Sequence, residues 1–253
     1  MKKYAIMGVE GPHDQVFTKK LLKLLGFKEF KGSKSELDSF WHKFIPKYPK
    51  NETAKLYERL SMPSIVFNES ISVAIYQGEG SNLKQNLEDI LCNNLEYQTD
   101  LAAFGIVADA DKKQPVSVAE EYADCFKNYF TNFPDKPGIV DTNKPRTGIY
   151  ILPDNVCEGV LDTLLCRCGE VAYPEYMKRA NAYISEFSEE ERKKLKWKPF
   201  DLDKVRVATV VSVLKPGKTN TVSVADNDWV SETTLGEVSL LANFQNFLRE
   251  ILE

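Results

Sequence analysis

The sequence predicts an α/β fold with a central, mostly parallel sheet flanked by helices, and three observations lead to that prediction. Short apolar runs rich in β-branched residues alternate with longer segments of helical periodicity, an order typical of parallel sheets. Three of these runs end in acidic residues, as expected at the carboxyl edge of such a sheet. The 253 residues, 43% of them hydrophobic, suffice for one sizeable core, so we expect a single domain over residues 1–253.

The first β-α unit is the clearest local prediction. Residues 4–9 form an apolar strand, and the Gly and Pro residues within 10–14 break it into a loop. Residues 16–25 then show helical spacing, with Gly26 as a good C-terminal stop. The following stretch, about 28–63, is rich in lysine and aromatic residues. We interpret it as a small insertion with a short helix near residues 51–60.

The rest of the chain continues the alternation and then becomes helical from about residue 170 to residue 253. Strands are expected over 65–67, 71–76, 101–108 and 147–152. Helices are expected from the N-cap Ser81 through 93, and over 116–129, 157–167, 174–187, 188–197 and 235–252. Residues 201–214 are ambiguous, because their valines favour a strand by propensity while their spacing also fits a helix; we favour the helix.

The overall composition restricts the function classes. A net charge of −4 and a pI of about 5.5 argue against a globally basic nucleic-acid-binding protein, so any such contact needs a local basic patch. The five cysteines, an odd number without a recognisable signal peptide, indicate reduced thiols in the cytoplasm. No apolar run approaches the ~20 residues of a membrane span.

Acidic side chains recur where the predicted strands end. They are Glu10 and Asp14 after the first strand, Asp109 and Asp111 after the strand over 101–108, and Asp154 and Asp162 after the strand over 147–152. Asp109 and Asp111 are two residues apart and would share a face of an extended segment. Because converging carboxylate oxygens suit Mg²⁺ or Mn²⁺, the sequence predicts a divalent metal site that serves phosphate chemistry.

Simpler interpretations stand beside these. Asp154 lies in Pro-Asp-Asn and could cap the following helix instead of binding metal. His13 is either a ligand or proton-transfer group or a solvated loop histidine. Cys166 and Cys168 lack a second pair or a nearby histidine, which favours buried or idle thiols over a zinc site.

Two lysine-rich regions are candidates for nucleic-acid contact, although charge runs on helices are often only solvated faces. The first surrounds Trp197 and suits a phosphate backbone with a stacked base; it comprises Arg192, Lys193, Lys194, Lys196 and Lys198. The second covers the first helix and the insertion, with Lys19, Lys20, Lys23, Lys28, Lys31, Lys34, Lys43, Lys47 and Lys50.

Taken together, the motifs resemble the Toprim fold, the catalytic domain of topoisomerases, bacterial primases and OLD-type nucleases. More closely, the chain resembles a Toprim-like family of small stand-alone proteins of uncharacterised function. The matching segments span nearly the whole chain and are Val9-Glu10-Gly11 with Asp14, residues 104–111, 148–155, 159–162 and 203–209. The small family usually carries Gly-x-Leu-Glu where this chain has Gly159-Val160-Leu161-Asp162.

This resemblance implies a metal-dependent phosphodiesterase or nuclease that acts on DNA or RNA. It implies Glu10 as metal ligand or general acid/base and Asp109 and Asp111 as ligands of Mg²⁺ or Mn²⁺. Asp162 would be the further acid of OLD-type nucleases, and Lys204 would stabilise charge at the phosphate.

The resemblance also suggests a partner and leaves other functions open. The chain has no G-x-x-x-x-G-K-[ST] loop, so an ATPase partner of the kind found in phage defence would be a separate protein. The alternative is a non-catalytic module that binds a metal or nucleotide and a protein partner. Nucleotidyl transfer, as in primases, is a third interpretation.

Overall fold

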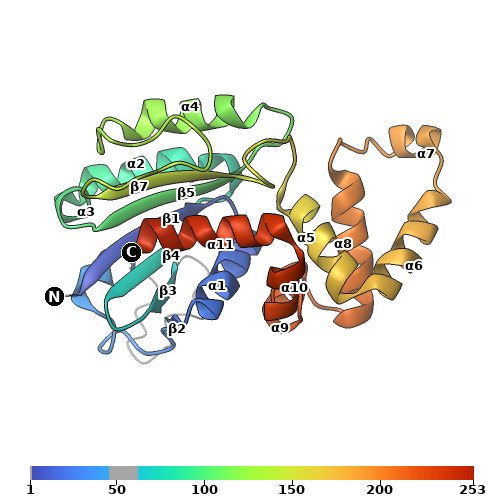
Figure 1. Ribbon diagram of the computed structural model, residues 1–253, viewed down its shortest axis with the longest axis horizontal. Helices are drawn as coiled ribbons and strands as arrows, with labels where there is room; N and C mark the ends of the chain where they lie inside the picture. Colours follow the sequence, from blue (N-terminus) through green and yellow to red (C-terminus); the bar gives the residue numbers. More distant parts are fainter. Residues whose placement is uncertain (1, 46–61) are drawn as a thin grey trace.

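The structure is a computed structural model that describes residues 2–45 and 62–253, so the helix predicted near residues 51–60 lies outside the described residues. Its centre is a seven-stranded mixed sheet in the order β2-β3-β4-β1-β5-β7-β6 (Figure 1). The four central strands are parallel: β4 (Ile71–Gln77), β1 (Lys3–Val9), β5 (Ala103–Asp109) and β7 (Arg146–Leu152). The outer strands are antiparallel: β2 (Lys28–Glu29), β3 (Ser64–Phe67) and β6 (Val140–Asp141).

Helices cover both faces of this sheet, which confirms the expected α/β architecture. One face packs against α2 (Leu83–Asn93), α3 (Leu95–Thr99) and α4 (Pro115–Phe126), with the short 3-10 turns η1 (Ser39–Phe44) and η3 (Gly80–Asn82) beside them. The other face packs against α1 (Pro12–Leu24) and α11 (Ser239–Leu252) (Figure 1). Because side chains alternate along a strand, Ile6 of β1 enters the first core and Met7 enters the second.

Two glycines let α11 approach the sheet closely. Gly105 of β5 and Gly148 of β7 are register partners beneath this helix. A Cβ atom would lie 2.8 Å from Ile251 Cδ1 at Gly105 and 3.0 Å from the same atom at Gly148. A larger residue at either position would therefore force the Ile251 side chain, and at Gly105 also Met7, to move.

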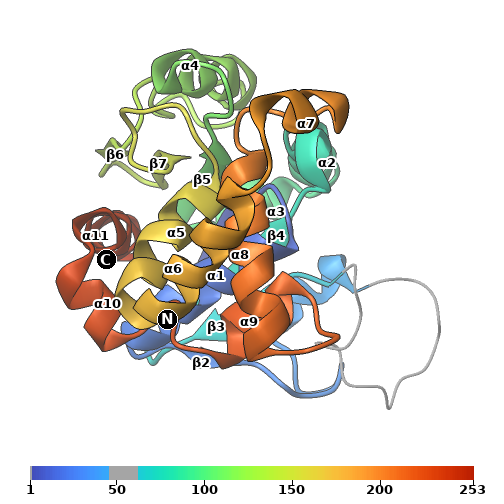
Figure 2. The same cartoon turned by 90° about the vertical axis from the view of Figure 1, so that its right-hand side faces the viewer.

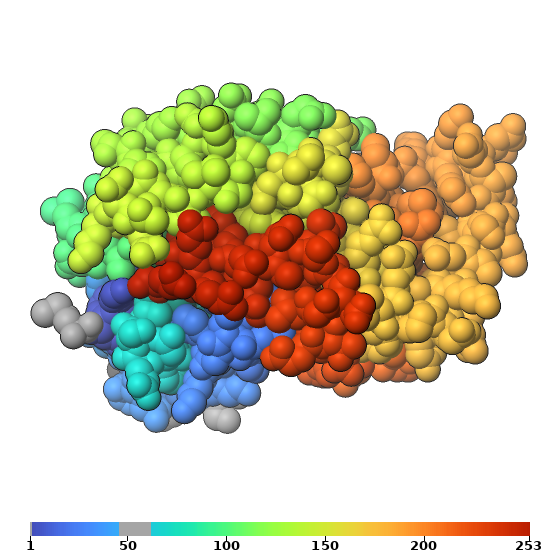
Figure 3. Space-filling view, in the orientation of Figure 1, coloured from blue at the N-terminus to red at the C-terminus, as the bar shows by residue number. Residues whose placement is uncertain are grey.

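After β7 the chain leaves the sheet at the carboxyl edge of the parallel strands. Helix α5 (Leu161–Ala172) leads into α6 (Pro174–Ser185), α7 (Glu189–Lys194) and α8 (Asp201–Leu214), and we call residues 174–214 the arm. The arm lies in front of the carboxyl edge when the molecule is viewed from its end (Figure 2), and in the space-filling view it forms a separate lobe beyond the sheet (Figure 3). Helices α9 (Asn220–Asp226) and α10 (Glu232–Glu237) return the chain to α11. No helix of the described residues is long and apolar enough to span a membrane.

Several predicted boundaries were wrong for local reasons. The helix predicted from 157 begins at Leu161, because the preceding residues form a turn and pair with the loop after β5. Ser81 is not an N-cap, because η3 precedes α2. The expected helix over 235–252 is divided at Val238 into α10 and α11, and the polar stretch before it contains α9. Residues 201–214 are helical as favoured.

Candidate functional site

The first two acidic motifs meet at the carboxyl edge because β1 and β5 are parallel neighbours. Val9 of β1 is in register with Val107 of β5, so the loops that follow both strands leave the sheet side by side. The backbone N–H of Asp109 donates to Glu10 Oε1 at 3.2 Å. This hydrogen bond joins two motifs that lie about 100 residues apart in the sequence.

The third motif is tied to the second by backbone pairing. Asp111 and Gly159 exchange hydrogen bonds of 2.8 and 3.0 Å, forming an isolated antiparallel bridge. The N–H of Leu161, the first residue of α5, donates to Asp109 Oδ1 at 2.8 Å. The start of α5, and with it Asp162, is thereby held against the Asp109 loop.

Burial and mutual repulsion disfavour the charged forms of these acids. Burial, followed by the charge of Asp14, raises the pKa of Glu10 to about 7. Burial raises the pKa of Asp14 to about 6, although the Gly11 N–H donates to its Oδ2 at 2.8 Å. Burial and the charges of Asp14 and Glu10 raise the pKa of Asp109 well above its usual range. Three carboxyl groups that disfavour one another's ionisation are therefore concentrated at this edge.

Asp111 reaches the cluster by a different backbone conformation from the one expected. Its φ is +51°, in the left-handed region, so the expected extended segment with Asp109 and Asp111 on one face was wrong. The bridge to Gly159 imposes this turn. The Asp111 side chain is exposed, and its charge nevertheless contributes to the raised pKa of Glu10 and of Asp109.

Two basic side chains flank Asp162 at the outer side of the cluster. Burial raises the pKa of Asp162, while His13 and Lys204 act in the opposite direction through their charges. Lys204 lies in the first turns of α8 and is exposed. His13 lies within α1 and is half-buried, and burial lowers its pKa. The structure thus brings the sequence candidate Lys204 near Asp162, a proximity that separation in sequence does not reveal.

The junction between α5 and α8 is held by a second set of polar contacts. Asp203 Oδ2 accepts from Thr163 Oγ1 at 2.8 Å, and Asp203 Oδ1 pairs with Arg206 Nη1 at 3.1 Å. These contacts fix the beginning of α8 beside the beginning of α5, and so they position Lys204.

Asp154 does not join the cluster. Its Oδ1 accepts the N–H groups of Val156 and Cys157 at 2.9 and 2.7 Å, a turn that closes the loop after β7. Its charge is not among those that raise the pKa values of Glu10, Asp14 and Asp109. Asp154 therefore forms a turn, as its Pro-Asp-Asn context indicated, but it does not cap the following helix, whose N-cap is Val160.

Tyr122 is a neighbour of the site that sequence reasoning missed. It lies on the buried face of α4, and the charges of Glu10 and Asp109 add to burial in raising its pKa. Nearby, Glu121 pairs with Lys113 at 2.6 Å and with Lys84 at 3.5 Å, which links the loop after Asp111 to α2 and α4. The helical spacing of α4 predicts a buried residue at 122, but not which strand end it faces.

The donor chemistry of the cluster fits a hard divalent cation. Glu10, Asp14 and Asp109 each use one carboxylate oxygen for a backbone N–H and keep a second oxygen available to a ligand. Over residues 2–45 and 62–253, no three acidic, histidine or cysteine side chains already surround a cation-sized point. Binding of an ion would therefore require carboxylates to turn inward from the orientations seen here.

The two predicted basic regions have different outcomes. Arg192 is not free, since its Nη2 donates to the Ile184 carbonyl at 2.9 Å and its guanidinium lies 5.7 Å from the Trp197 ring centroid. The other four cations of that run are exposed: Lys193, Lys194, Lys196 and Lys198. In the second region, Lys19 and Lys23 pair with Glu29, while Lys47 and Lys50 lie outside the described residues.

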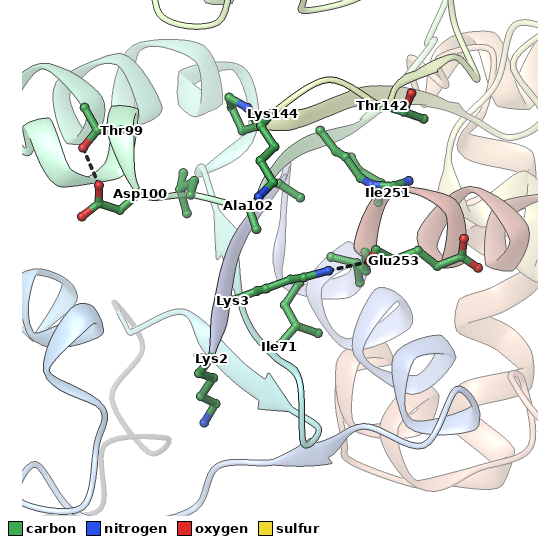
Figure 4. Close-up of a pocket in the computed structure, with 15 residues that line it drawn as sticks. Lys2, Lys3, Ile71, Thr99, Asp100, Ala102, Thr142, Lys144, Ile251 and Glu253 are labelled. Carbon is green, nitrogen blue, oxygen red and sulfur yellow. Dashed lines mark hydrogen bonds between the residues drawn. The ribbon is translucent and has the colours of Figure 1, made fainter.

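A pocket of about 600 Å³ opens at the opposite, amino edge of the sheet (Figure 4). Two of the four cations that line it have structural partners: Lys3 Nζ donates to the Glu253 carbonyl at 2.7 Å, and Arg146 Nη1 donates to the Glu250 carbonyl at 2.8 Å. Both cap the C-terminus of α11, where positive charge is favourable. Cys166 and Cys168 are buried free thiols, one of the two states expected for them.

Comparison with known proteins identifies the family of this chain and a solved structure of similar fold. The fold and the acidic cluster define an α/β protein with a candidate site at the carboxyl edge of its parallel strands. The chain belongs to the family described as protein of unknown function DUF3226, whose profile matches residues 4–253. Its fold is similar to the crystal structure of a hypothetical protein from Pyrococcus horikoshii, with a TM-score of 0.57 and 17% identity over 98% of this chain and 95% of that chain. A search of curated proteins found no match.

Proposed function

We propose that this protein is a Mg²⁺- or Mn²⁺-dependent phosphodiesterase that cleaves nucleic acid at the carboxyl edge of its sheet, with a Toprim-like arrangement of acids. The observation that carries the proposal is that hydrogen bonds hold three acidic loops side by side at the carboxyl edge, namely those of Glu10, Asp109 and Asp162. Carboxylates gathered in this way, without a buried cation opposite them, are suited to hold a metal ion.

Each residue has a distinct role in this proposal. Glu10 and Asp109 are the central ligands, and Asp14 and Asp111 complete the set from either side. A divalent cation, when bound, supplies positive charge to the scissile phosphate and makes water more acidic. Lys204, exposed beside Asp162, would neutralise charge that develops on the phosphate oxygens. Glu10 is also the candidate to accept a proton from the attacking water.

The test is a cleavage assay with plasmid, single-stranded DNA and total RNA in Mg²⁺, Mn²⁺ or EDTA. We expect metal-dependent cleavage by the wild type and a loss of at least about 100-fold in the Asp109→Ala/Asp111→Ala variant, since even outer-shell changes at metal sites cost 10–100-fold. Asp100→Ala is the matched control, because Asp100 precedes the opposite end of the same strand. Cleavage retained by the double variant would exclude these ligands.

The second candidate function is a binding module that holds a cation without catalysis. It is favoured by the lack, among the described residues, of three acidic, histidine or cysteine side chains already grouped around one point, since catalysis needs a more exact ligand geometry than binding does. Calorimetric titration of Mg²⁺ separates the two functions: binding that is lost in the double variant, together with no cleavage of any substrate, would support the module. An ATPase partner stays a prediction from the resemblance, and adding candidate ATPases to an inactive wild type would test it.

A further inference from the structure

One flank of α6 carries exposed aromatic rings that the core does not use. Tyr176 and Tyr183 are 38% and 54% exposed and lie seven residues apart, two helical turns on the same flank. Arg179 lies between them. The buried face of this helix is formed instead by Met177, Ala180 and Ile184. The two tyrosines therefore lie outside the core, and Tyr176 contacts only the edge of the neighbouring Tyr173 ring among the described aromatic rings, with centroids 6.4 Å apart.

The rings of this flank are held in defined positions by their neighbours. The Arg179 guanidinium lies 6.0 Å from the Tyr176 ring centroid, within the range of a cation–π contact. Tyr183 contacts the Phe187 ring edge-to-face with centroids 5.4 Å apart. At 1.5 Å of rise per residue, the two tyrosines are roughly 10 Å apart along the helix. Two such platforms with a cation between them suit successive unpaired bases.

The adjoining helix supplies charge complementary to a phosphate backbone. Arg192 joins α7 to the end of α6 through the Ile184 carbonyl, so the basic run lies beside the C-terminal end of the helix that carries the tyrosines. Lys193, Lys194, Lys196 and Lys198 are exposed, and among the described residues none of these four has an ion-pair partner. The same helix begins with Glu189, Glu190 and Glu191, so the positive charge is confined to residues 192–198. Over the whole arm nine lysines and arginines stand against seven acids, a balance of +2 in a chain of net charge −4.

The arm also connects this surface to the candidate site. Helix α8 follows α7, and its first turns bring Lys204 beside Asp162, while the arm lies in front of the carboxyl edge of the sheet (Figure 2). A strand bound along α6 and α7 would thus be held on the same side of the molecule as the acidic cluster.

We infer that the arm binds single-stranded nucleic acid, with bases stacked on Tyr176 and Tyr183 and phosphates on the lysines of residues 193–198. The inference rests on the proposed function and deepens it by naming the substrate class. A duplex buries its base faces in its own stack, so it cannot use the tyrosines, whereas every unpaired base offers a face to an aromatic ring.

The experiment measures the affinity of fluorescent 20-mers by anisotropy in EDTA, where no cleavage occurs. The probes are oligothymidylate, oligouridylate, an abasic strand with the same phosphates, and a duplex. The proteins are the wild type, Tyr176→Ala/Tyr183→Ala, and the ring-preserving control Tyr176→Phe/Tyr183→Phe. Stacking of ~1–3 kcal/mol per base converts to a loss of about 5-fold or more per ring in the alanine variant. We expect the phenylalanine variant to bind like the wild type and the abasic strand to be insensitive to both changes.

Three results would overturn the inference: no oligonucleotide binding by the wild type, equal binding by the alanine variant, or a preference for the duplex. Sedimentation of both proteins adds a fourth, since self-association that is lost only in the alanine variant would make this flank a protein interface. Failure of the proposed function can be distinguished from failure of this inference. Stacking-dependent binding without any cleavage would support binding by the arm and contradict the proposed enzymatic function. Cleavage of single strands with an unchanged KM in the alanine variant would support the enzymatic function and contradict binding by the arm.

Discussion

The two edges of the central sheet handle charge in opposite ways. At the amino edge, Lys3 and Arg146 meet the carbonyl groups that end α11, so each charge has a partner built into the fold. At the carboxyl edge, Glu10, Asp14 and Asp109 crowd together, and burial and repulsion raise all three pKa values. The paired cations at the first edge stabilise the fold, whereas ionisation of the crowded carboxyl groups at the second edge costs stability, and this is why we propose the functional site there.

The largest expected effect is a dependence of stability on pH that arises at the carboxyl edge. A Glu10 pKa of about 7 against the usual 4.5 means that the folded protein binds the proton more tightly than the unfolded chain does. Its contribution to the free energy of unfolding is therefore greatest at low pH and is lost as pH rises from about 4.5 to about 7. The loss is on the order of 3 kcal/mol, at about 1.4 kcal/mol per pKa unit.

Denaturant titrations at pH 5 and pH 8 in EDTA, on the wild type and on Glu10→Gln, check this prediction. The glutamine keeps an oxygen for the Asp109 N–H and cannot ionise, so we expect the variant to be the more stable protein at pH 8 and similar to the wild type at pH 5. Equal pH dependence in both proteins would mean that folding does not raise the pKa of Glu10.

The next effect is stabilisation by a cation, which would sharpen the contrast between the edges. An ion at 100 times its Kd adds about 2.7 kcal/mol to the free energy of unfolding, which raises Tm by roughly 5–10 °C in a chain of this size. We expect Mg²⁺ or Mn²⁺ to produce this rise in the wild type and not in Asp109→Ala/Asp111→Ala, as measured by scanning calorimetry. An equal rise in both proteins would place the ion elsewhere.

The smallest effect belongs to the amino edge. Arg146→Ala removes one hydrogen bond to the Glu250 carbonyl and a favourable charge at the end of α11, so we expect a loss of about 1 kcal/mol in the free energy of unfolding. Cleavage and cation binding should be unchanged. A loss of activity much larger than the loss of stability would show that this edge also has a functional role, and the comparison of the two edges would fail.

The sequence by itself determined the α/β class and the ends of the central strands. The apolar runs that became β1, β5 and β7 have the length and the flanking turn residues of buried parallel strands, and acidic residues follow each of them. Since parallel strands end at one edge, the proximity of Glu10 and Asp109 followed from that pattern. Helix α8 was predicted against the β propensity of its valines, and burial of Val207, Val210 and Val211 in the arm explains why the helical spacing prevailed.

Only the tertiary structure decided what the loops do. The pairing of Asp111 with Gly159 turned one acid into a left-handed conformation, and a local turn took Asp154 out of the cluster. The packing of α5 against α8 brought Lys204 to Asp162, and the packing of α6 against α5 and α8 left one flank of α6 exposed. Periodicity encodes which residues are buried within an element. It does not encode which loop hydrogen-bonds to which, because those contacts depend on how distant elements pack.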